Sequence, residues 1–353
     1  WETAQALSYM RYSINTADAF YLAEKEYYDE VGPQAQNYLL EYTRAMLETP
    51  FRQELEESGQ IIPLVFRSFE VELKAMSPEI VQDMIEENRL VSQYSQLMAG
   101  MEFPFRGENL PRPMLMKYAK SPDRATRKEA YEVLGKTLKA HSDQLDGIFD
   151  QLVHVRDRMA KKMGYQNFVE LGYYRMGRNC YTKADVEKFR AAVRKYLVPL
   201  ADSIYREQAK RLGKQYPMSF ADNALEFRSG NPRPAGTPDD ILAQGMKFYS
   251  ELSPETKEFF ETMLRDELLD VLSTEGKQAG GYCTSIMDYQ VPFIFANFNG
   301  TQHDVEVVTH EAGHAFEAWT NRKRIPIDYI WPSMEACEVH SMSMEFFAEP
   351  WAD

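Results

Sequence analysis

Cysteine is scarce in this sequence, whose 353 residues include only Cys180, Cys283 and Cys337. The three are widely spaced, and no Cys-x-x-Cys pair occurs. An odd number of separated cysteines argues against a disulfide framework and is typical of reduced thiols. We therefore expect a cytoplasmic protein.

Long apolar runs and an excess of basic charge are also missing. The longest unbroken apolar run, around Val291 to Ala296, is far shorter than the roughly 18 residues that cross a bilayer. The 40 Lys and Arg residues are outnumbered by 54 Asp and Glu residues, which gives a formal net charge of −14. A nucleic-acid-binding surface needs concentrated basic charge. The sequence thus predicts neither a transmembrane helix nor a nucleic-acid partner, and it carries no signal for an oligomeric state.

The overall composition is that of an ordinary folded protein. Hydrophobic residues make up 44% of the chain and charged residues 27%, which is far from disordered compositions. A chain of this length exceeds what one small core usually organises. We expect one large helical body or two lobes around a cleft.

Proline and glycine divide the chain into regions. Helical periodicity extends from about residue 17 to residue 214, with a loop expected at Phe103–Pro113. The stretch Tyr216–Pro238 contains four prolines and two glycines, which exclude regular structure over about twenty residues. We predict a helical N-terminal lobe over residues 1–215, a Pro/Gly-rich linker over residues 216–238 and a second region over residues 239–353.

The second region combines helices with a small β element. Helical periodicity is found in Asp239–Tyr249 and Pro254–Leu269. Two short runs rich in β-branched and aromatic residues follow, Tyr282–Ile286 and Val291–Phe298. They predict a hairpin or a small antiparallel sheet directly before the next helix.

The run THEAGHAF at residues 309–316 places His310 and His314 four residues apart, with Glu311 between them. In a sequence of this composition such a match arises by chance on the order of once in a hundred cases. On a helix the two histidines lie about 40° apart in rotation and about 6 Å apart along the axis, so both imidazoles can reach one ion. Glu311 projects from a neighbouring direction, where it could take a proton from water without being a ligand. The pattern predicts a hydrolytic zinc site.

A catalytic zinc site usually has three protein ligands, so a third is expected downstream. The candidates all lie within Trp331–Phe347: Glu335, Glu338, His340 and Glu345. A second buried helix is expected there from the apolar spacing of Met334, Cys337, Met342, Met344 and Phe346. If Glu338 faces the ion, Glu345 lies on the same helix face two turns away and could hydrogen-bond a ligand histidine. The spacing leaves both Glu338 and Glu335 open as the third ligand.

The other histidines have plainer interpretations. His340 is two residues from Glu338 and so on another helix face, where a hydrogen-bonded core histidine is expected. His303 precedes the helix and is expected in a turn or behind the ligands. His141 and His154 stand alone on long helices and are interpreted as surface or satisfied interior residues.

Gly313 interrupts the helix that carries the two histidines. A glycine at mid-helix costs about 1 kcal/mol relative to alanine, so it should have a structural reason. Close helix packing and space for an approaching substrate are equally good explanations. Thr301 or Asp304 is expected to cap this helix.

Two segments of this second region resemble a known family. The run GGYCTSIMDYQVPFIFANFNGTQHDVEVVTHEAGHAF, followed by EACEVHSMSMEFF, is similar to the oligoendopeptidase F branch of the thimet-type oligopeptidases, the M3 family of zinc metallopeptidases. The resemblance extends back through RATRKEAYEVL at residues 124–134. It implies a mostly α-helical zincin peptidase with two lobes around a deep channel, one zinc ion on its floor and a small sheet beside it. The implied substrates are short unstructured peptides.

The resemblance also implies roles for single residues. The family's two histidine ligands match His310 and His314, its general base matches Glu311, and its third ligand matches Glu338. By the same analogy, the stretch at Gly281, Tyr282 and Cys283 lies on an edge strand along which substrate backbone is laid, a β-augmentation mode of binding. Core packing is an equally good interpretation of the Tyr282 and Cys283 side chains.

The resemblance leads us to expect a zinc-dependent endopeptidase that hydrolyses internal bonds of short oligopeptides. Family members continue well past this segment, so we expect that the C-terminal part of the catalytic domain is missing, with the tyrosine and glycine donors that stabilise the oxyanion. Each such donor can contribute about 3 kcal/mol, so the segment alone could lack activity. The alternatives are a non-catalytic, zinc-stabilised peptide-binding module, a dipeptide-releasing exopeptidase of the same fold and a metal-free helical scaffold.

Overall fold

Helices dominate the computed structural model, which describes residues 1–324 and 330–351. The long helical pattern predicted for the first two thirds of the chain is confirmed. The helices of this part are α1 (Glu2–Ile14), α2 (Ala19–Leu47), α3 (Arg52–Glu57), α4 (Pro63–Ala75), α5 (Val81–Ala99), α6 (Arg112–Ala119), α7 (Arg124–Ala140), α8 (Ser142–Lys162), α9 (Phe168–Arg175), α10 (Lys183–Ala192) and α11 (Val198–Leu212). A single π-helical turn (Val193–Leu197) joins the last two.

The segment Phe103–Pro113, expected to be a loop, instead contains a small hairpin. Strands β1 (Phe103–Phe105) and β2 (Glu108–Leu110) pair antiparallel. Arg106 and Gly107 form the two-residue turn, both with positive φ, which suits the twist of a tight hairpin. Proline obscured the strand signal because it is usually excluded from central strands, whereas this two-stranded hairpin tolerates it.

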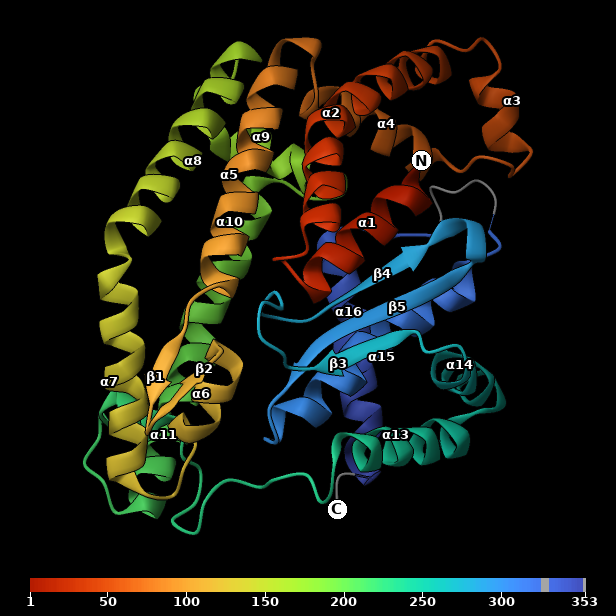
Figure 1. Cartoon of the computed structure of the whole chain (residues 1–353). Helices are drawn as coiled ribbons and strands as arrows, with labels where there is room; N and C mark the ends of the chain where they lie inside the picture. The colour runs from red at the N-terminus through yellow and green to blue at the C-terminus, as the bar shows by residue number, and fades with distance from the viewer. Residues whose placement is uncertain (325–329, 352–353) are drawn as a thin grey trace.

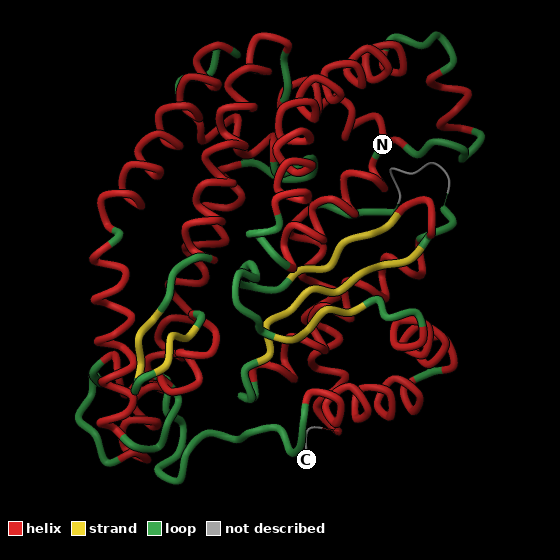
Figure 2. Tube along the Cα trace, viewed as in Figure 1, coloured by secondary structure: helices red, strands yellow, loops and turns green. Residues whose placement is uncertain are grey.

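The chain crosses between two groups of elements through residues 213–237. Helices α5 to α8, α10 and α11 stand on one side of the molecule, and the larger sheet with the C-terminal helices stands on the other (Figure 1). The connecting stretch contains one short helix, α12 (Phe220–Asn223), and otherwise runs as loop (Figure 2). It reaches α13 (Pro238–Leu252), whose start is fixed by a capping box between Thr237 and Asp240.

Three strands form the larger sheet, in the order β3-β5-β4. β4 (Tyr282–Ile286) and β5 (Val291–Phe298) pair antiparallel, at the two runs that the sequence predicted. β3 (Leu269–Leu272), which the sequence did not predict, pairs parallel with β5, so the sheet is mixed and not antiparallel throughout. Helix α14 (Pro254–Arg265) ends four residues earlier than expected, because Glu267 takes a positive φ of 53° that stops the helix, and Leu269 already begins β3.

The two faces of the sheet pack against different parts of the chain. Side chains alternate along β5, so Phe293 and Phe295 face α1 together with Ile286, whereas Ile294 and Ala296 face the C-terminal helices. The N-terminal helix therefore lies on the sheet formed by residues beyond 268, as Figure 1 also shows. Two backbone hydrogen bonds reinforce this contact, from Gln278 N to Ser13 O at 2.8 Å and from Thr16 N to Gly276 O at 2.9 Å.

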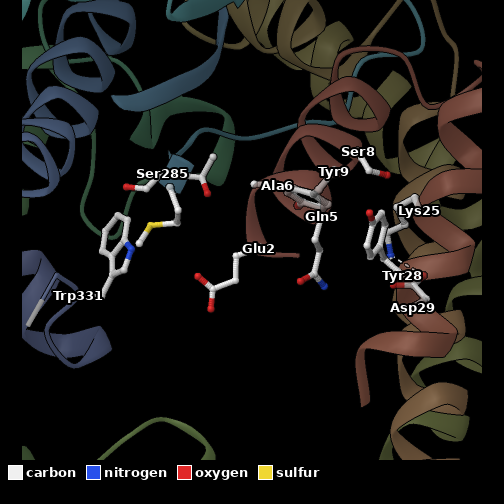
Figure 3. A pocket seen from close by; sticks show the side chains of 12 residues that line it. Glu2, Gln5, Ala6, Ser8, Tyr9, Lys25, Tyr28, Asp29, Ser285 and Trp331 are labelled. Carbon is white, nitrogen blue, oxygen red and sulfur yellow. Dashed lines mark hydrogen bonds and ion pairs between the residues drawn. The ribbon is translucent and has the colours of Figure 1, made fainter. Parts of the chain in front are cut away.

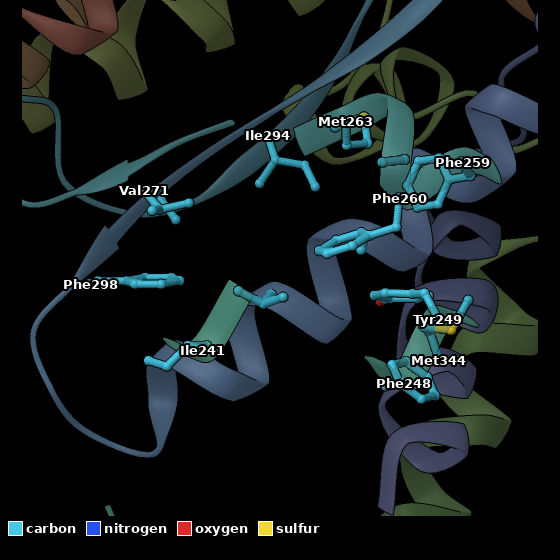
Figure 4. Close-up of a cluster of buried hydrophobic side chains, with 14 residues drawn as sticks. Ile241, Phe248, Tyr249, Phe259, Phe260, Met263, Val271, Ile294, Phe298 and Met344 are labelled. Carbon is cyan, nitrogen blue, oxygen red and sulfur yellow. The ribbon is translucent and has the colours of Figure 1, made fainter. Parts of the chain in front are cut away.

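An aromatic core supports the other face of the sheet (Figure 4). Tyr249 of α13 stacks on Phe260 of α14 with ring centroids 4.5 Å apart. Met344 and β5 residue Ile294 belong to the same cluster, as does Val308 of α15 (His303–Asn321). Each buried side chain of this size contributes about 1.5 to 3 kcal/mol relative to an exposed one. The cluster fixes α15 between the sheet and α16 (Met334–Ala348).

Candidate metal centre

The loop between β5 and α15 is tied to the helix by one buried carboxylate. Asp304, 2% exposed, accepts hydrogen bonds from Asn299 N at 2.9 Å and Gly300 N at 2.7 Å. Neither Asp304 nor Thr301 caps the N-terminus as expected: Asp304 binds the loop before the helix, and the Thr301 hydroxyl donates to Asn299. This arrangement sets where α15 begins relative to the sheet.

The two histidines of α15 converge as the sequence predicted. The Nε2 atoms of His310 and His314 lie 3.2 Å apart. Two nitrogen ligands at about 2.05 Å from a tetrahedral ion would lie about 3.3 Å apart, so this spacing suits a shared zinc ion. Burial lowers the pKa of His314 to about 4, with His310 adding to the effect and Glu338 opposing it. His314 is therefore neutral, the protonation state in which an imidazole binds a metal.

Glu338 of α16 completes a group of three donors. Its Oε2 lies 3.3 Å from His310 Nε2, and its Oε1 lies 3.9 Å from His314 Nε2. One ligand atom from each residue falls within 4.8 Å of the others. Two imidazole nitrogens and one carboxylate oxygen are the donor set of many catalytic zinc sites, so the residues fit this ion.

Glu335, another candidate for the third ligand, is engaged elsewhere. The Glu335 carboxylate pairs with Arg178, whose Nη2 lies 2.5 Å from Oε1. The same guanidinium lies over the ring of Tyr173, 4.1 Å from its centroid. Glu335 thus links α16 to the segment that follows α9.

Glu345 lies behind His310, in the position that the helix spacing suggested. Its Oε1 is 2.6 Å from His310 Nδ1. A carboxylate accepts a hydrogen bond, so the proton resides on Nδ1. The lone pair of Nε2 then points at the place where the three donors meet. Glu345 therefore selects the tautomer that binds a metal.

Replacing Glu345 by alanine is expected to weaken zinc binding about 10- to 100-fold, because His310 loses the partner that fixes its tautomer and orientation. Glu345→Gln, which keeps an acceptor but loses the charge, should fall between this variant and the parent. Competition with a chromophoric chelator measures the affinity. The exposed Glu349 provides the control, since Glu349→Ala removes the same charge from the end of α16. Equal zinc affinities in all these proteins would contradict the role of Glu345.

Gly313 lets α16 approach α15 closely enough to bring Glu338 to the histidines. A Cβ atom at this position would lie 2.6 Å from Ser341 Cα and 3.1 Å from the His340 carbonyl oxygen. The first distance is shorter than real Cβ contacts, and both neighbours are backbone atoms. Of the two explanations for this glycine, close helix packing is therefore the one that the contacts support.

Glu311 is buried beside the three donors without being one of them. Only 8% of the Glu311 surface is exposed. Burial raises the pKa of its carboxyl to about 7, with His310 opposing the effect and Glu338 adding to it. A carboxyl with a pKa near neutrality can both take up and release a proton at neutral pH.

Gly281 brings the edge strand against Glu311, a contact that the sequence did not reveal. A Cβ atom on Gly281 would lie 3.2 Å from Glu311 Oε1 and 3.4 Å from the Phe295 carbonyl oxygen. The hydrogen bonds from Asn297 Nδ2 to the Gln278 and Gly280 carbonyl oxygens, both 2.8 Å, hold this end of the strand. The backbone of β4 thus begins beside the buried carboxyl.

The side chains that follow Gly281 are packed within the fold. Tyr282 stacks on Phe295 with ring centroids 4.8 Å apart and faces α1. Cys283 packs on the opposite face against the core under α15, and burial raises the pKa of its thiol. Core packing accounts for both side chains, so any contact of these residues with a peptide would come from their backbone.

The remaining histidines lie apart from the donors or beside them without ligating. His340 packs edge-on against His314 with ring centroids 5.2 Å apart. Burial lowers the pKa of its ring, and a hydrogen bond with the Gly313 backbone opposes this effect, so a packed, hydrogen-bonded histidine stays the prediction. His303 is the exposed first residue of α15, 3.3 Å from Glu306. His141 and His154 bind carbonyl oxygens of their own helices.

The helix that carries Glu338 is less buried than its apolar spacing indicated. Ser341 and Met344 are buried, but Met342 is 51% exposed, Val339 68% and Phe346 70%. Met344 is buried on the side that faces Gly313, whereas Met342 and Phe346 are exposed among the described residues. The expectation of a buried second helix therefore holds for one face only.

A cavity of about 650 Å³ adjoins the far end of β4. It is bounded by Thr284 and Ser285 of β4 on one side and by residues of α1 and α2 on the other (Figure 3). Sequence reasoning missed this site, because its walls come from segments more than 250 residues apart. No local pattern in α1 marks it.

Two histidines and a glutamate around one point, with a buried carboxyl and a strand edge beside them, are typical of metallopeptidases. Comparisons with known proteins agree. The N-terminal domain model of peptidase family M3 matches residues 1–76, and the model described as peptidase family M3 matches residues 248–351. The chain belongs to peptidase family M3.

Solved structures refine this assignment. A protein from Bacillus anthracis, provisionally named oligoendopeptidase F, is 44% identical with a TM-score of 0.96, over 99% of this chain and 64% of its own. A second protein with the same provisional name is 43% identical, with a TM-score of 0.96, and is matched over 61% of its length. Pz peptidase A, solved with an inhibitor, is 44% identical, with a TM-score of 0.96, and is matched over 62% of its length. The chain therefore spans less than two thirds of these relatives. The comparison with curated proteins found no match.

Proposed function

We propose that the protein is a zinc-dependent endopeptidase that hydrolyses internal bonds of short oligopeptides. One observation carries the proposal: three metal-donor side chains meet beside a buried glutamate that does not ligate. The family membership and the name of Pz peptidase A support a peptide as the substrate. The activity is a proposal because the chain spans less than two thirds of these relatives.

In this proposal His310, His314 and Glu338 hold the ion, and Glu345 keeps the His310 lone pair directed at it. Bound zinc supplies a Lewis acid that activates water and polarises a carbonyl group. Glu311 takes a proton from the attacking water and later gives it to the leaving amine. The backbone of β4 offers an edge on which an extended peptide can pair, which brings a peptide bond next to Glu311.

The proposal divides the chain into three functional parts. Residues 239–353 would carry the metal centre, residues 1–215 would form a helical lobe, and residues 216–238 would connect them. Helix α1 belongs to the lobe in sequence but packs on the sheet of the metal-binding region. The described residues include no helix with the length and apolar character needed to cross a membrane. A cytoplasmic location is proposed on the three cysteines, none of which is in a disulfide.

Removal of the metal tests the proposal. Dialysis against a strong chelator is expected to abolish cleavage of an internally quenched peptide, and one equivalent of zinc should restore it. The same addition should raise the unfolding temperature, because an ion that binds only the native state stabilises it. Mass spectrometry of products from peptides of different length shows whether internal bonds are cut or dipeptides are released. Undiminished cleavage by protein shown to be metal-free would refute the zinc mechanism.

A further inference from the structure

We propose that the cavity beside β4 is a subsite for a cationic side chain of the peptide, and that Glu2 is the residue that recognises it. The inference rests on the proposed peptidase function and adds a specificity to it. It concerns the cavity of about 650 Å³ bounded by β4, α1 and α2.

The position of the cavity follows from the strand that links it to the metal centre. Gly281 adjoins Glu311, whereas Thr284 and Ser285, three and four residues further along, line the cavity. β4 is an edge strand that pairs only with β5 in the described sheet. At about 3.3 Å per residue, the cavity lies about 10 to 13 Å along the strand from Gly281. A peptide paired with this edge, with its cleaved bond beside Glu311, therefore places the side chain three or four residues away at the cavity.

The charge of the cavity comes from one carboxylate. Lys25 and Asp29, on α2, form an ion pair with 2.5 Å between Nζ and Oδ2, so their charges offset each other. Glu2 is exposed and forms no hydrogen bond or ion pair with the described part of the chain. In Figure 3 its side chain extends into the space between Trp331 on one side and Gln5 and Tyr28 on the other. An unpaired anion in a partly enclosed space favours a cation.

The aromatic walls suit the same ligand. Trp331 and the rings of Tyr9 and Tyr28 line the cavity. A guanidinium or ammonium group gains from contact with aromatic faces, and the long stem of Arg or Lys packs against apolar surface while its charge reaches a carboxylate. The walls therefore match an Arg or Lys side chain better than an acidic or a short apolar one.

Peptide binding to a variant that does not turn over tests the inference. In the Glu311→Gln background, peptides with Arg are compared with peptides that carry neutral citrulline, at each position three or four residues on either side of the cleaved bond. At one of these positions, the Arg peptide is expected to bind about three- to tenfold more tightly than the citrulline peptide. This is the size of effect that an exposed ion pair with a cation–π contact gives. Adding Glu2→Gln should bring this ratio close to one, and Glu2→Lys should invert it.

The control is Glu41→Gln, which removes the same charge from α2 about 18 Å along the helix beyond Asp29. It should leave the Arg preference unchanged. Glu2 is exposed, so its variants are expected to fold, and circular dichroism checks this. A preference that is absent from the parent, or that survives Glu2→Gln, overturns the inference while leaving the peptidase intact. If no peptide is bound or cleaved, the proposed function itself fails, and the inference with it.

Discussion

Glu311→Gln is expected to lower the rate of peptide cleavage by about 10²- to 10⁴-fold while zinc binding remains stoichiometric. The amide keeps the size of the carboxylate but cannot take a proton from water. Glu311 is not one of the three grouped donor residues, His310, His314 and Glu338, so we expect the proposed metal centre to stay intact. Cleavage of an internally quenched peptide, together with elemental analysis of the same preparation, measures both quantities.

A matched control is available on the same helix. Glu306, two turns before His314, is exposed and pairs only with His303 among the described residues. Glu306→Gln removes one negative charge from α15 without touching the donors, so its cleavage rate should stay close to that of the parent. Turnover in Glu311→Gln at the parental rate would remove Glu311 from the mechanism. Loss of zinc from this variant would instead make Glu311 part of the metal centre.

The pair of histidines could be predicted from the sequence because the information is local. Helical geometry alone brings residues i and i+4 to one face, and the observed 3.2 Å between the two Nε2 atoms follows from it. The third ligand could not be chosen in this way, since Glu335 and Glu338 lie on neighbouring positions of another helix. The structure separates them by their partners: Glu335 binds Arg178, and Glu338 faces the histidines.

The features of the fold that the sequence did not predict also depend on contacts between distant segments. Strand β3 was not predicted, because its residues pair in parallel with β5, more than twenty positions away, and local periodicity does not encode that pairing. The position of α1 on the sheet depends on Phe293 and Phe295, far along the chain. The proposed subsite at Glu2 depends on the same contact, so it could not be anticipated from the residues of α1.

Gly313→Ala is expected to disrupt the metal centre although residue 313 carries no donor. The added Cβ would lie 2.6 Å from Ser341 Cα, and because the obstacle is backbone, α16 must move away from α15 as a unit. Such overpacking typically costs about 1 to 3 kcal/mol of stability. Glu338 moves with α16, so we expect zinc affinity to fall on the order of 10- to 100-fold, as after loss of a residue that supports a ligand.

Gly147→Ala provides the comparison that separates packing from helix propensity. Gly147 lies within α8, and a Cβ there would meet no atom within 4 Å. This variant should gain about 1 kcal/mol of stability from the better helix former. Chemical denaturation and zinc titration of both variants give the answer. If Gly313→Ala were as stable as Gly147→Ala and bound zinc as tightly as the parent, helix contact at Gly313 would not be what brings Glu338 to the histidines. If Gly313→Ala loses stability and zinc affinity together, the close approach of the two helices at Gly313 also sets the geometry of the metal centre.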